Sequence, residues 1–113
     1  MTIHITKYTE LGVLRKATNQ EKPFVMAQVT HVNDAETIEY TLAGEPVYLG
    51  DDTTLIVVEN DAAEAFYFAV SLDDDVDLDT HFNIRNPATT YEVYGVLPGS
   101  YFVAEATKGT GPT

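Results

Sequence analysis

Alternation of apolar and polar residues dominates most of the chain. Residues 37–42 show it most clearly, because every second residue of this segment is apolar. Residues 24–32 and 54–58 are instead apolar at nearly every position, which is typical of strands buried on both faces. Turn-forming Asn, Asp, Gly and Pro residues separate these segments. The pattern predicts a mainly β domain of about five to seven short strands over residues 23–106.

A different spacing marks the residues before these strands. Leu11, Leu14 and Ala17 recur every three residues, as they would on one side of a helix. We therefore expect a short helix over about residues 6–19, ahead of the strands. Residues 107–113 are rich in Gly and Pro, and we expect them to form a flexible tail.

Length and composition favour one small soluble domain over residues 1–113. The chain has 113 residues, and 44% of them are hydrophobic, which suits a packed core. It contains no Cys, which excludes disulfides, zinc–thiolate sites and a Cys nucleophile. No apolar run approaches the roughly 20 residues of a membrane span, and the first residues lack the core of a signal peptide. We expect a cytoplasmic protein, in the host cytoplasm if its origin is viral, without membrane contact.

The charges are distributed unevenly along the chain. The formal net charge is −12, from 18 acidic and 6 basic residues. Residues 34–84 contain 14 acidic residues and no Lys or Arg, whereas residues 1–33 carry four basic and two acidic residues, a net of +2. The overall field repels phosphate, so bulk attraction to nucleic acid is excluded. We interpret the acidic stretch first as a solubilising surface, and alternatively as a surface that binds a basic partner.

One part of this stretch has the spacing of a calcium loop. Asp75, Asp77 and Asp79 follow the D-x-D-x-D pattern that opens an EF-hand, where alternate residues supply oxygen ligands. The Gly of that loop is Thr80 here, and its final bidentate Glu is Asn86. Without the sharp turn and the bidentate carboxylate, we expect a solvated acidic loop that does not bind calcium tightly.

The sequence contains no recognisable catalytic motif. Nucleotide-binding, serine-hydrolase and zinc-protease patterns are all absent. The histidines are far apart in the sequence: His4, His31 and His81. We therefore expect no enzyme, no catalytic residue, no metal site and no cofactor.

A short motif resembles that of a known family. Ile84, Arg85 and Asn86 resemble the Ile-Arg-Gly of the second signature of Sm and Sm-like proteins, with Asn86 in place of the Gly. The Cys-free, acidic composition is similar to that of Sm-like proteins attributed to marine cyanobacterial viruses. The resemblance implies an N-terminal helix, a strongly bent antiparallel five-stranded barrel, and a cyclic homo-oligomeric ring that binds single-stranded RNA or DNA. The nucleic-acid-binding residues expected on this basis are Arg85, Asn86, Lys7, Arg15 and Lys16.

Other interpretations stay open. The fold is alternatively another small β-barrel or sandwich. The function is alternatively that of an acidic structural or protein-interaction module, of viral origin or not, without nucleic acid. Arg85 is alternatively paired with an Asp of residues 73–79. Under either function, strands with open edges favour a homo-oligomer in which edges pair between copies.

Overall fold

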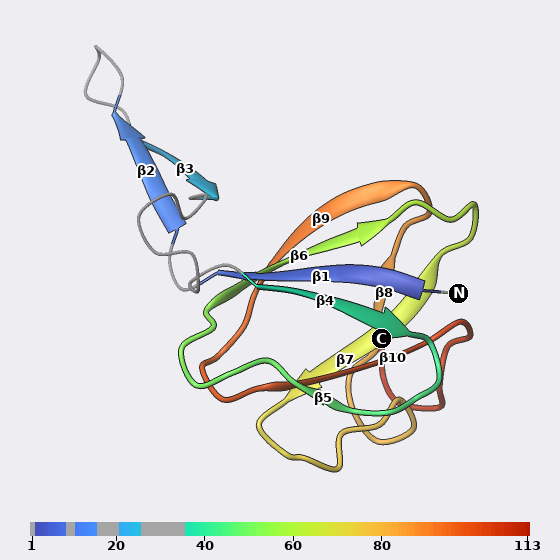
Figure 1. Cartoon of the computed structure of the whole chain (residues 1–113). Helices are drawn as coiled ribbons and strands as arrows, with labels where there is room; N and C mark the ends of the chain where they lie inside the picture. The colour runs from blue at the N-terminus through green and yellow to red at the C-terminus, as the bar shows by residue number, and fades with distance from the viewer. Residues whose placement is uncertain (1, 9–10, 16–20, 26–35) are drawn as a thin grey trace.

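The computed structural model describes residues 2–8, 11–15, 21–25 and 36–113, and these residues form ten strands and no helix (Figure 1). The strands in chain order are β1 (Thr2–Tyr8), β2 (Leu11–Arg15), β3 (Glu21–Val25), β4 (Glu36–Thr41), β5 (Val47–Tyr48), β6 (Leu55–Asn60), β7 (Phe66–Ser71), β8 (Ile84–Asn86), β9 (Thr90–Gly95) and β10 (Tyr101–Glu105). The mainly β fold predicted from the alternation is thereby confirmed.

Eight of these strands form two antiparallel sheets that pack face to face. Sheet 1 has the strand order β4-β1-β6-β9, and sheet 2 has the order β5-β10-β7-β8. The first and last strands, β1 and β10, each have neighbours on both sides. The other two strands, β2 and β3, form a hairpin that Figure 1 draws beyond the end of β1, away from both sheets. The described fold is a β-sandwich with a separate hairpin.

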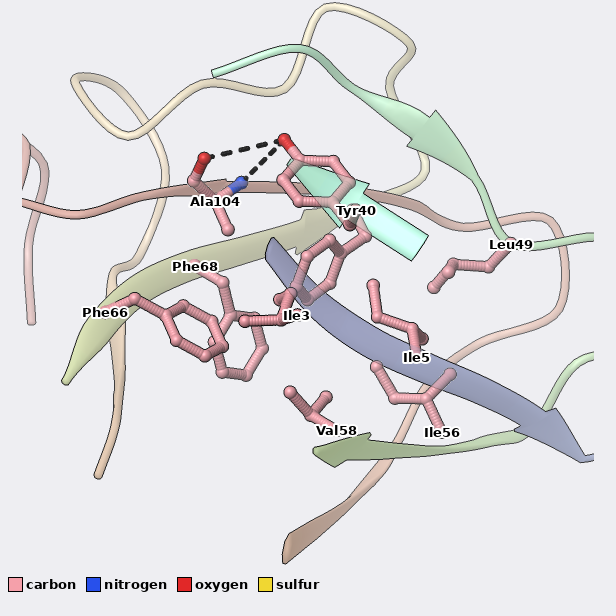
Figure 2. Packing of buried hydrophobic residues seen from close by; sticks show 10 residues of the cluster. Ile3, Ile5, Tyr40, Leu49, Ile56, Val58, Phe66, Phe68 and Ala104 are labelled. Atoms are coloured by element: carbon pink, nitrogen blue, oxygen red, sulfur yellow. Dashed lines mark hydrogen bonds between the residues drawn. The ribbon is translucent and has the colours of Figure 1, made fainter. Parts of the chain in front are cut away.

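The core lies between the two sheets because alternate residues of each strand point inward. Phe68 of β7 stacks on Phe102 of β10, with ring centroids 5.1 Å apart. Tyr40 of β4 links the sheets, since its hydroxyl accepts a 3.0 Å hydrogen bond from the N–H of Ala104 in β10 (Figure 2). Both sheets supply fully buried side chains: Ile3, Ile5, Ile56 and Val58 from sheet 1, and Phe66, Phe68, Phe102 and Ala104 from sheet 2.

A loop covers the outer face of sheet 2. It joins β7 to β8 over residues 72–83, and its Val76 and Leu78 are only 1% exposed. Both pack against Ala69 of β7 and Val103 of β10 in a second hydrophobic cluster. Because Ala69 and Val103 alternate with residues that face the main core, this cluster lies on the side turned away from sheet 1.

The last residues of the chain hold this loop against the sheet. The N–H of Gly109 donates to Oδ1 of Asn83 at 2.9 Å, and the N–H of Gly111 donates to the carbonyl of Leu78 at 2.9 Å. The approach is close, since a Cβ on Gly111 would lie 2.2 Å from the carbonyl oxygen of His81. These bonds restrain the segment for which the sequence predicts a flexible tail.

The helix predicted over residues 6–19 is wrong for the residues that the structure describes. Residues 6–8 belong to β1 and residues 11–15 to β2, and the rest of the predicted helix lies outside the described residues. Residues 6–8 pair with β4 and β6, and residues 11–15 pair with β3, and these pairings outweigh a weak three-residue spacing interrupted by Gly12. The five-stranded Sm-like barrel is not confirmed, since no closed barrel occurs among the described strands.

Of three strand predictions, two are confirmed and the third can be compared with the structure only in part. Residues 37–42 and 54–58 correspond to β4 and β6, which confirms these predictions to within a few residues. The strand predicted over residues 24–32 coincides with β3 at its first two residues only. Its remaining residues lie outside the part of the chain that the structure describes.

Candidate interaction surface

Arg85 lies on an exposed edge of the sandwich. It is the middle residue of β8, the outermost strand of sheet 2, and it is directly opposite Tyr67 of β7. Its side chain is exposed, and it forms no ion pair with any described residue, including the acidic residues 73–79. The alternative interpretation of Arg85 as the partner of a loop aspartate is therefore not supported by the described geometry.

Asn86 is a buried residue of the core rather than a surface neighbour of Arg85. It is 0% exposed, and its Oδ1 accepts a 2.8 Å hydrogen bond from the hydroxyl of Tyr94 in β9. Its Nδ2 donates to the carbonyl of Pro87 at 3.1 Å. Adjacent residues of a strand point to opposite faces, so Arg85 and Asn86 do not line one pocket.

The other predicted basic residues lie in different parts of the molecule. Lys7 is in β1 of sheet 1, between Glu36 of β4 and Ile56 of β6 in the strand register. Arg15 ends β2 in the hairpin, and Lys16 lies outside the described residues. The predicted set is thus divided among sheet 2, sheet 1 and the hairpin.

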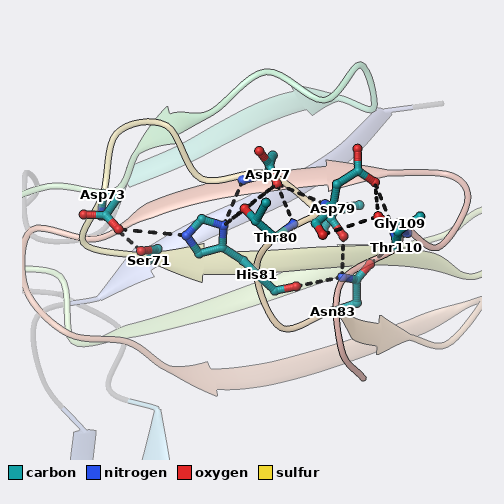
Figure 3. Close-up of polar contacts among 10 residues, drawn as sticks. Ser71, Asp73, Asp77, Asp79, Thr80, His81, Asn83, Gly109 and Thr110 are labelled. Atoms are coloured by element: carbon teal, nitrogen blue, oxygen red, sulfur yellow. Dashed lines mark hydrogen bonds and ion pairs between the residues drawn. The ribbon is translucent and has the colours of Figure 1, made fainter.

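The acidic loop uses its carboxylates to hold its own shape (Figure 3). Oδ1 of Asp77 accepts hydrogen bonds from the N–H of Asp79 at 3.0 Å, and from the N–H and hydroxyl of Thr80 at 2.8 and 2.7 Å. These bonds, the Thr80 hydroxyl first, hold the pKa of Asp77 below its ordinary value. Oδ1 of Asp79 accepts instead from the N–H of Thr110 at 3.1 Å. The carboxylates therefore bind separate backbone segments.

The described histidines, His4 and His81, lie in different parts of the sandwich. His81 lies in this loop, with Nε2 at 3.9 Å from Asp73 and Nδ1 at 4.0 Å from Asp77. His4 lies in β1 of sheet 1, and His31 lies outside the described residues. Within the described ranges, no three His, Asp or Glu side chains are grouped so that they could hold a metal ion.

The outer face of sheet 1 carries rows of side chains that run across its four strands. One row has the register Glu39–His4–Glu59–Tyr91, and the next has Thr37–Thr6–Val57–Val93. These residues alternate with core-facing ones, so they point away from sheet 2.

Both rows end in large exposed side chains on β9. Tyr91 is 72% exposed and Val93 is 49% exposed. The Tyr91 hydroxyl donates to Oε1 of Glu59 at 3.0 Å, and this bond raises the pKa of Tyr91. We call Tyr91, Val93, Val57 and Glu59 the β9 surface.

The strand that carries this surface is also an open edge. Among the described strands, β9 pairs with β6 alone, and it is six residues long. The edge strands of sheet 2 are shorter, with three residues in β8 and two in β5. Glu92 alternates with Tyr91 and Val93, so it points to the core side of β9 together with Tyr94. Burial raises the pKa of Tyr94 to about 12, and the charge of Glu92 adds to this effect.

Comparisons with protein-family models, with curated proteins and with solved structures gave no match to this chain. Among the described residues, no helix is long and apolar enough to cross a membrane. The candidate surface therefore rests on its geometry alone. The sequence contained a partial signal for it, since Tyr91 and Tyr94 are three positions apart and therefore lie on opposite faces of a strand.

Proposed function

We propose that this chain is an acidic protein-interaction module that binds a partner protein strand at β9. The observation that carries the proposal is the open six-residue edge of β9 with the exposed Tyr91 and Val93 beside it. A sheet edge presents unpaired N–H and C=O groups that an extended segment can pair with. Exposed aromatic and aliphatic side chains next to such an edge supply the apolar contact of an interface.

The charge of the sandwich supports a protein partner over nucleic acid. Residues 2–8 and 36–113 contain 3 basic residues (Lys7, Arg85 and Lys108) and 15 acidic residues, so their net charge is 3 − 15 = −12. This field repels a phosphate backbone and attracts basic segments. A partner strand that fits the β9 edge is therefore apolar on one face and carries Lys or Arg.

Site-specific photo-cross-linking tests this proposal. Benzoylphenylalanine replaces Tyr91, and the labelled protein is irradiated in an extract of the cells that naturally contain it. The matched control carries the same group at Thr41, which is exposed on the opposite edge strand of the same sheet. We expect protein adducts from position 91 and few from position 41. Equal adducts at both positions, or none at position 91, would contradict a specific role for β9.

A second proposal, the Sm-like ring that binds single-stranded nucleic acid, is favoured by the exposure of Arg85. This arginine forms no ion pair with a described residue and lies on a short edge strand that Pro87 follows, and ring symmetry would repeat it in every copy. The proposal also requires the sheets to bend into the five-stranded barrel of that family.

Fluorescence anisotropy with short oligo-U and oligo-A at low salt separates the two proposals. The proteins compared are the wild type, Arg85→Ala and Arg85→Lys. The ring proposal predicts weak, salt-dependent binding that Arg85→Ala removes and Arg85→Lys weakens. No binding by the wild type, or equal binding by all three, leaves the protein-interaction module as the function.

A further inference from the structure

We propose that the strand bound at β9 runs antiparallel to it and carries its apolar residues before its basic ones. This inference rests on the proposed function, since it specifies the direction and the residue order of that partner. An aliphatic residue of the partner lies opposite Val93, and Lys or Arg residues follow opposite Glu92 and Tyr91. The partner is thus an extended protein segment of defined order rather than any apolar strand.

The backbone groups on the open side of β9 belong to alternate residues. The N–H of Val96, directly after β9, donates to the carbonyl of Thr54 at 3.0 Å. The bonding side alternates along an antiparallel strand, so every second residue back from Val96 directs its N–H and C=O groups toward β6. The residues between them direct these groups toward the open edge: Tyr91, Val93 and Gly95. A partner strand that bonds all three therefore covers the whole second half of β9 and part of the first.

An antiparallel partner continues the pattern of sheet 1. All three strand pairs of this sheet are antiparallel, and antiparallel pairing is slightly more stable per residue than parallel pairing. In such a pair, each of the three outward residues exchanges hydrogen bonds with the partner residue directly opposite. The partner then meets Gly95 first and Tyr91 last.

The start of β9 is surrounded by carboxylates. Glu59 accepts the 3.0 Å hydrogen bond from the Tyr91 hydroxyl. The N–H of Thr89 donates to the carbonyl of Ala62 at 3.0 Å, which holds the turn of residues 61–65 beside this end of the strand. The strand, its neighbour β6 and this turn together supply four acidic residues: Glu59, Asp61, Glu64 and Glu92. Basic residues of a partner are therefore favoured at this end.

The end of β9 is apolar. Residues 93–98 contain no charged residue, and Leu97 is 64% exposed. A Cβ on Gly95 would meet only the carbonyl oxygen of Thr54, at 4.0 Å, so a large side chain of a partner has room there. Aromatic residues pack well opposite such a glycine at a sheet edge. Apolar residues of a partner are therefore favoured at this end.

The other charges of the sandwich do not cancel this difference. The N–H of Gly99 donates to the carbonyl of Gly50 at 2.9 Å, so Asp51 and Asp52 lie past the apolar end of β9. Lys7 offsets them in part, because its Nζ is 3.9 Å from the position of a Cβ on Gly50. The other two basic residues of the described sandwich lie on the sheet 2 side, Arg85 on β8 and Lys108 in the last residues of the chain.

The residue order of the partner follows from these two ends. The residue opposite Gly95 comes first and is apolar, and the residue opposite Val93 is aliphatic. The next residue is opposite Glu92, where Lys or Arg forms a cross-strand pair of opposite charge. The residue after it is opposite Tyr91, where an Arg lies over the exposed ring and next to Glu59. A parallel partner would need the reverse order.

A designed peptide tests this order. Its core, Phe-Thr-Ile-Lys-Arg-Thr, places Phe opposite Gly95, Ile opposite Val93 and Lys opposite Glu92, and its matched control has the same residues in reverse order. Fluorescence anisotropy of the labelled peptides with the whole chain measures binding. We expect a Kd of about 1 mM or lower for the forward peptide, and binding at least about fivefold weaker for the reversed one. No binding by the forward peptide, or equal binding by both, overturns the inference.

Methylation of single peptide nitrogens tests whether the contact is a strand pair. The N–H of Ile in the peptide points toward β9, whereas the N–H of the following Lys points away from it. We expect N-methyl-Ile to weaken binding about tenfold or more and N-methyl-Lys to leave it within about threefold. Equal effects of the two methyl groups would overturn the antiparallel pairing.

Charge exchange tests the position of the basic residue. Glu92→Lys should weaken binding of the forward peptide about fivefold or more, and a peptide with Glu in place of its Lys should recover binding to this variant. Glu39→Lys makes the same charge change on β4, the opposite edge strand of sheet 1, and should leave binding within about twofold. Failure of the exchanged pair to recover, while circular dichroism of the variant matches wild type, overturns the assignment of this position.

Cross-linking at position 91 separates this inference from the proposed function. Protein adducts at that position, from a chain that does not bind the designed peptide, would retain a partner strand at β9 and reject this residue order.

Discussion

The two outer faces of the sandwich differ in what covers them. On sheet 2, the loop of residues 72–83 buries Val76 and Leu78, and the last residues of the chain bind that loop. On sheet 1, Tyr91 and Val93 remain exposed at the open strand β9. Among the described residues, a loop therefore covers one of these faces, while large side chains stay exposed on the other. The difference favours a stabilising role for the loop over sheet 2, and it is the basis of our proposal that a partner binds on the sheet 1 side.

The largest expected effect compares an apolar residue on each face. Leu78→Ala should lower the free energy of unfolding by about 2–4 kcal/mol, because it leaves a cavity in the cluster over sheet 2. Val93→Ala should change it by less than about 0.5 kcal/mol, since the side chain is half exposed. Urea unfolding followed by circular dichroism measures both. Similar losses for both variants would show that the sheet 1 face is also covered.

A pair of glycines gives the next comparison. Gly111→Ala should cost about 1–3 kcal/mol of unfolding free energy, because its Cβ would lie 2.2 Å from the carbonyl oxygen of His81. Gly95→Ala on β9 meets only the carbonyl oxygen of Thr54 at 4.0 Å, so we expect a change below about 0.5 kcal/mol. Amide hydrogen exchange should also show faster exchange at Gly109 in the Gly111→Ala variant. Unchanged exchange there would mean that the tail does not hold the loop.

A smaller effect concerns acid stability of the loop. The pKa of Asp77 is lowered from 3.8 by the Thr80 hydroxyl and by backbone N–H groups. Its charged form is therefore favoured in the folded state, and the resulting stabilisation is present above about pH 4 and lost as the pH falls through the lowered pKa. Asp77→Asn should flatten the decline of unfolding free energy on the acid side, and Asp74→Asn should not. Urea unfolding at a series of pH values measures this, and identical profiles for both variants would contradict it.

The smallest effect lies on the exposed face. The hydrogen bond to Glu59 raises the pKa of Tyr91 from 10.0, so the neutral phenol is favoured in the folded state. The stabilisation is present below pH 10 and is lost as the pH rises through the raised pKa. Ultraviolet titration should show one tyrosine that ionises earlier in Glu59→Gln than in the wild type. A titration that Glu59→Gln leaves unchanged would mean that solvent replaces this bond.

The β architecture was predictable where the apolar pattern was strong. Residues 37–42 alternate so regularly that β4 follows from the sequence alone. The helix prediction over residues 6–19 was wrong where it can be compared. Residues 6–8 are a strand through pairing with the distant β4 and β6, which leaves no local signal, and residues 11–15 pair with β3. The sequence predicts a solvated acidic loop at residues 73–79, and it did not indicate that Asp77 and Asp79 accept hydrogen bonds from backbone N–H groups.

The candidate surface was harder to predict than the fold. Arg85 and Asn86 form one motif in the sequence, yet the two-residue period of β8 places one outside and the other in the core. In β9, both faces carry apolar residues, so the sequence does not indicate whether Tyr91 or Tyr94 faces the core. That choice is made by the pairing with β6, where Tyr94 is opposite Ile56 and Tyr91 is opposite Glu59.

The interior positions of β1 and β10 have a consequence for the synthesis of this protein. β1 is made before its two neighbours, β4 and β6, which are complete only at residues 41 and 60. Sheet 2 likewise lacks its link between β5 and β7 until residue 105 has been made. Neither sheet can therefore form fully before distant strands have been made, and folding is expected to be slow. Until then the apolar strands are exposed, and the high negative charge keeps nascent chains apart.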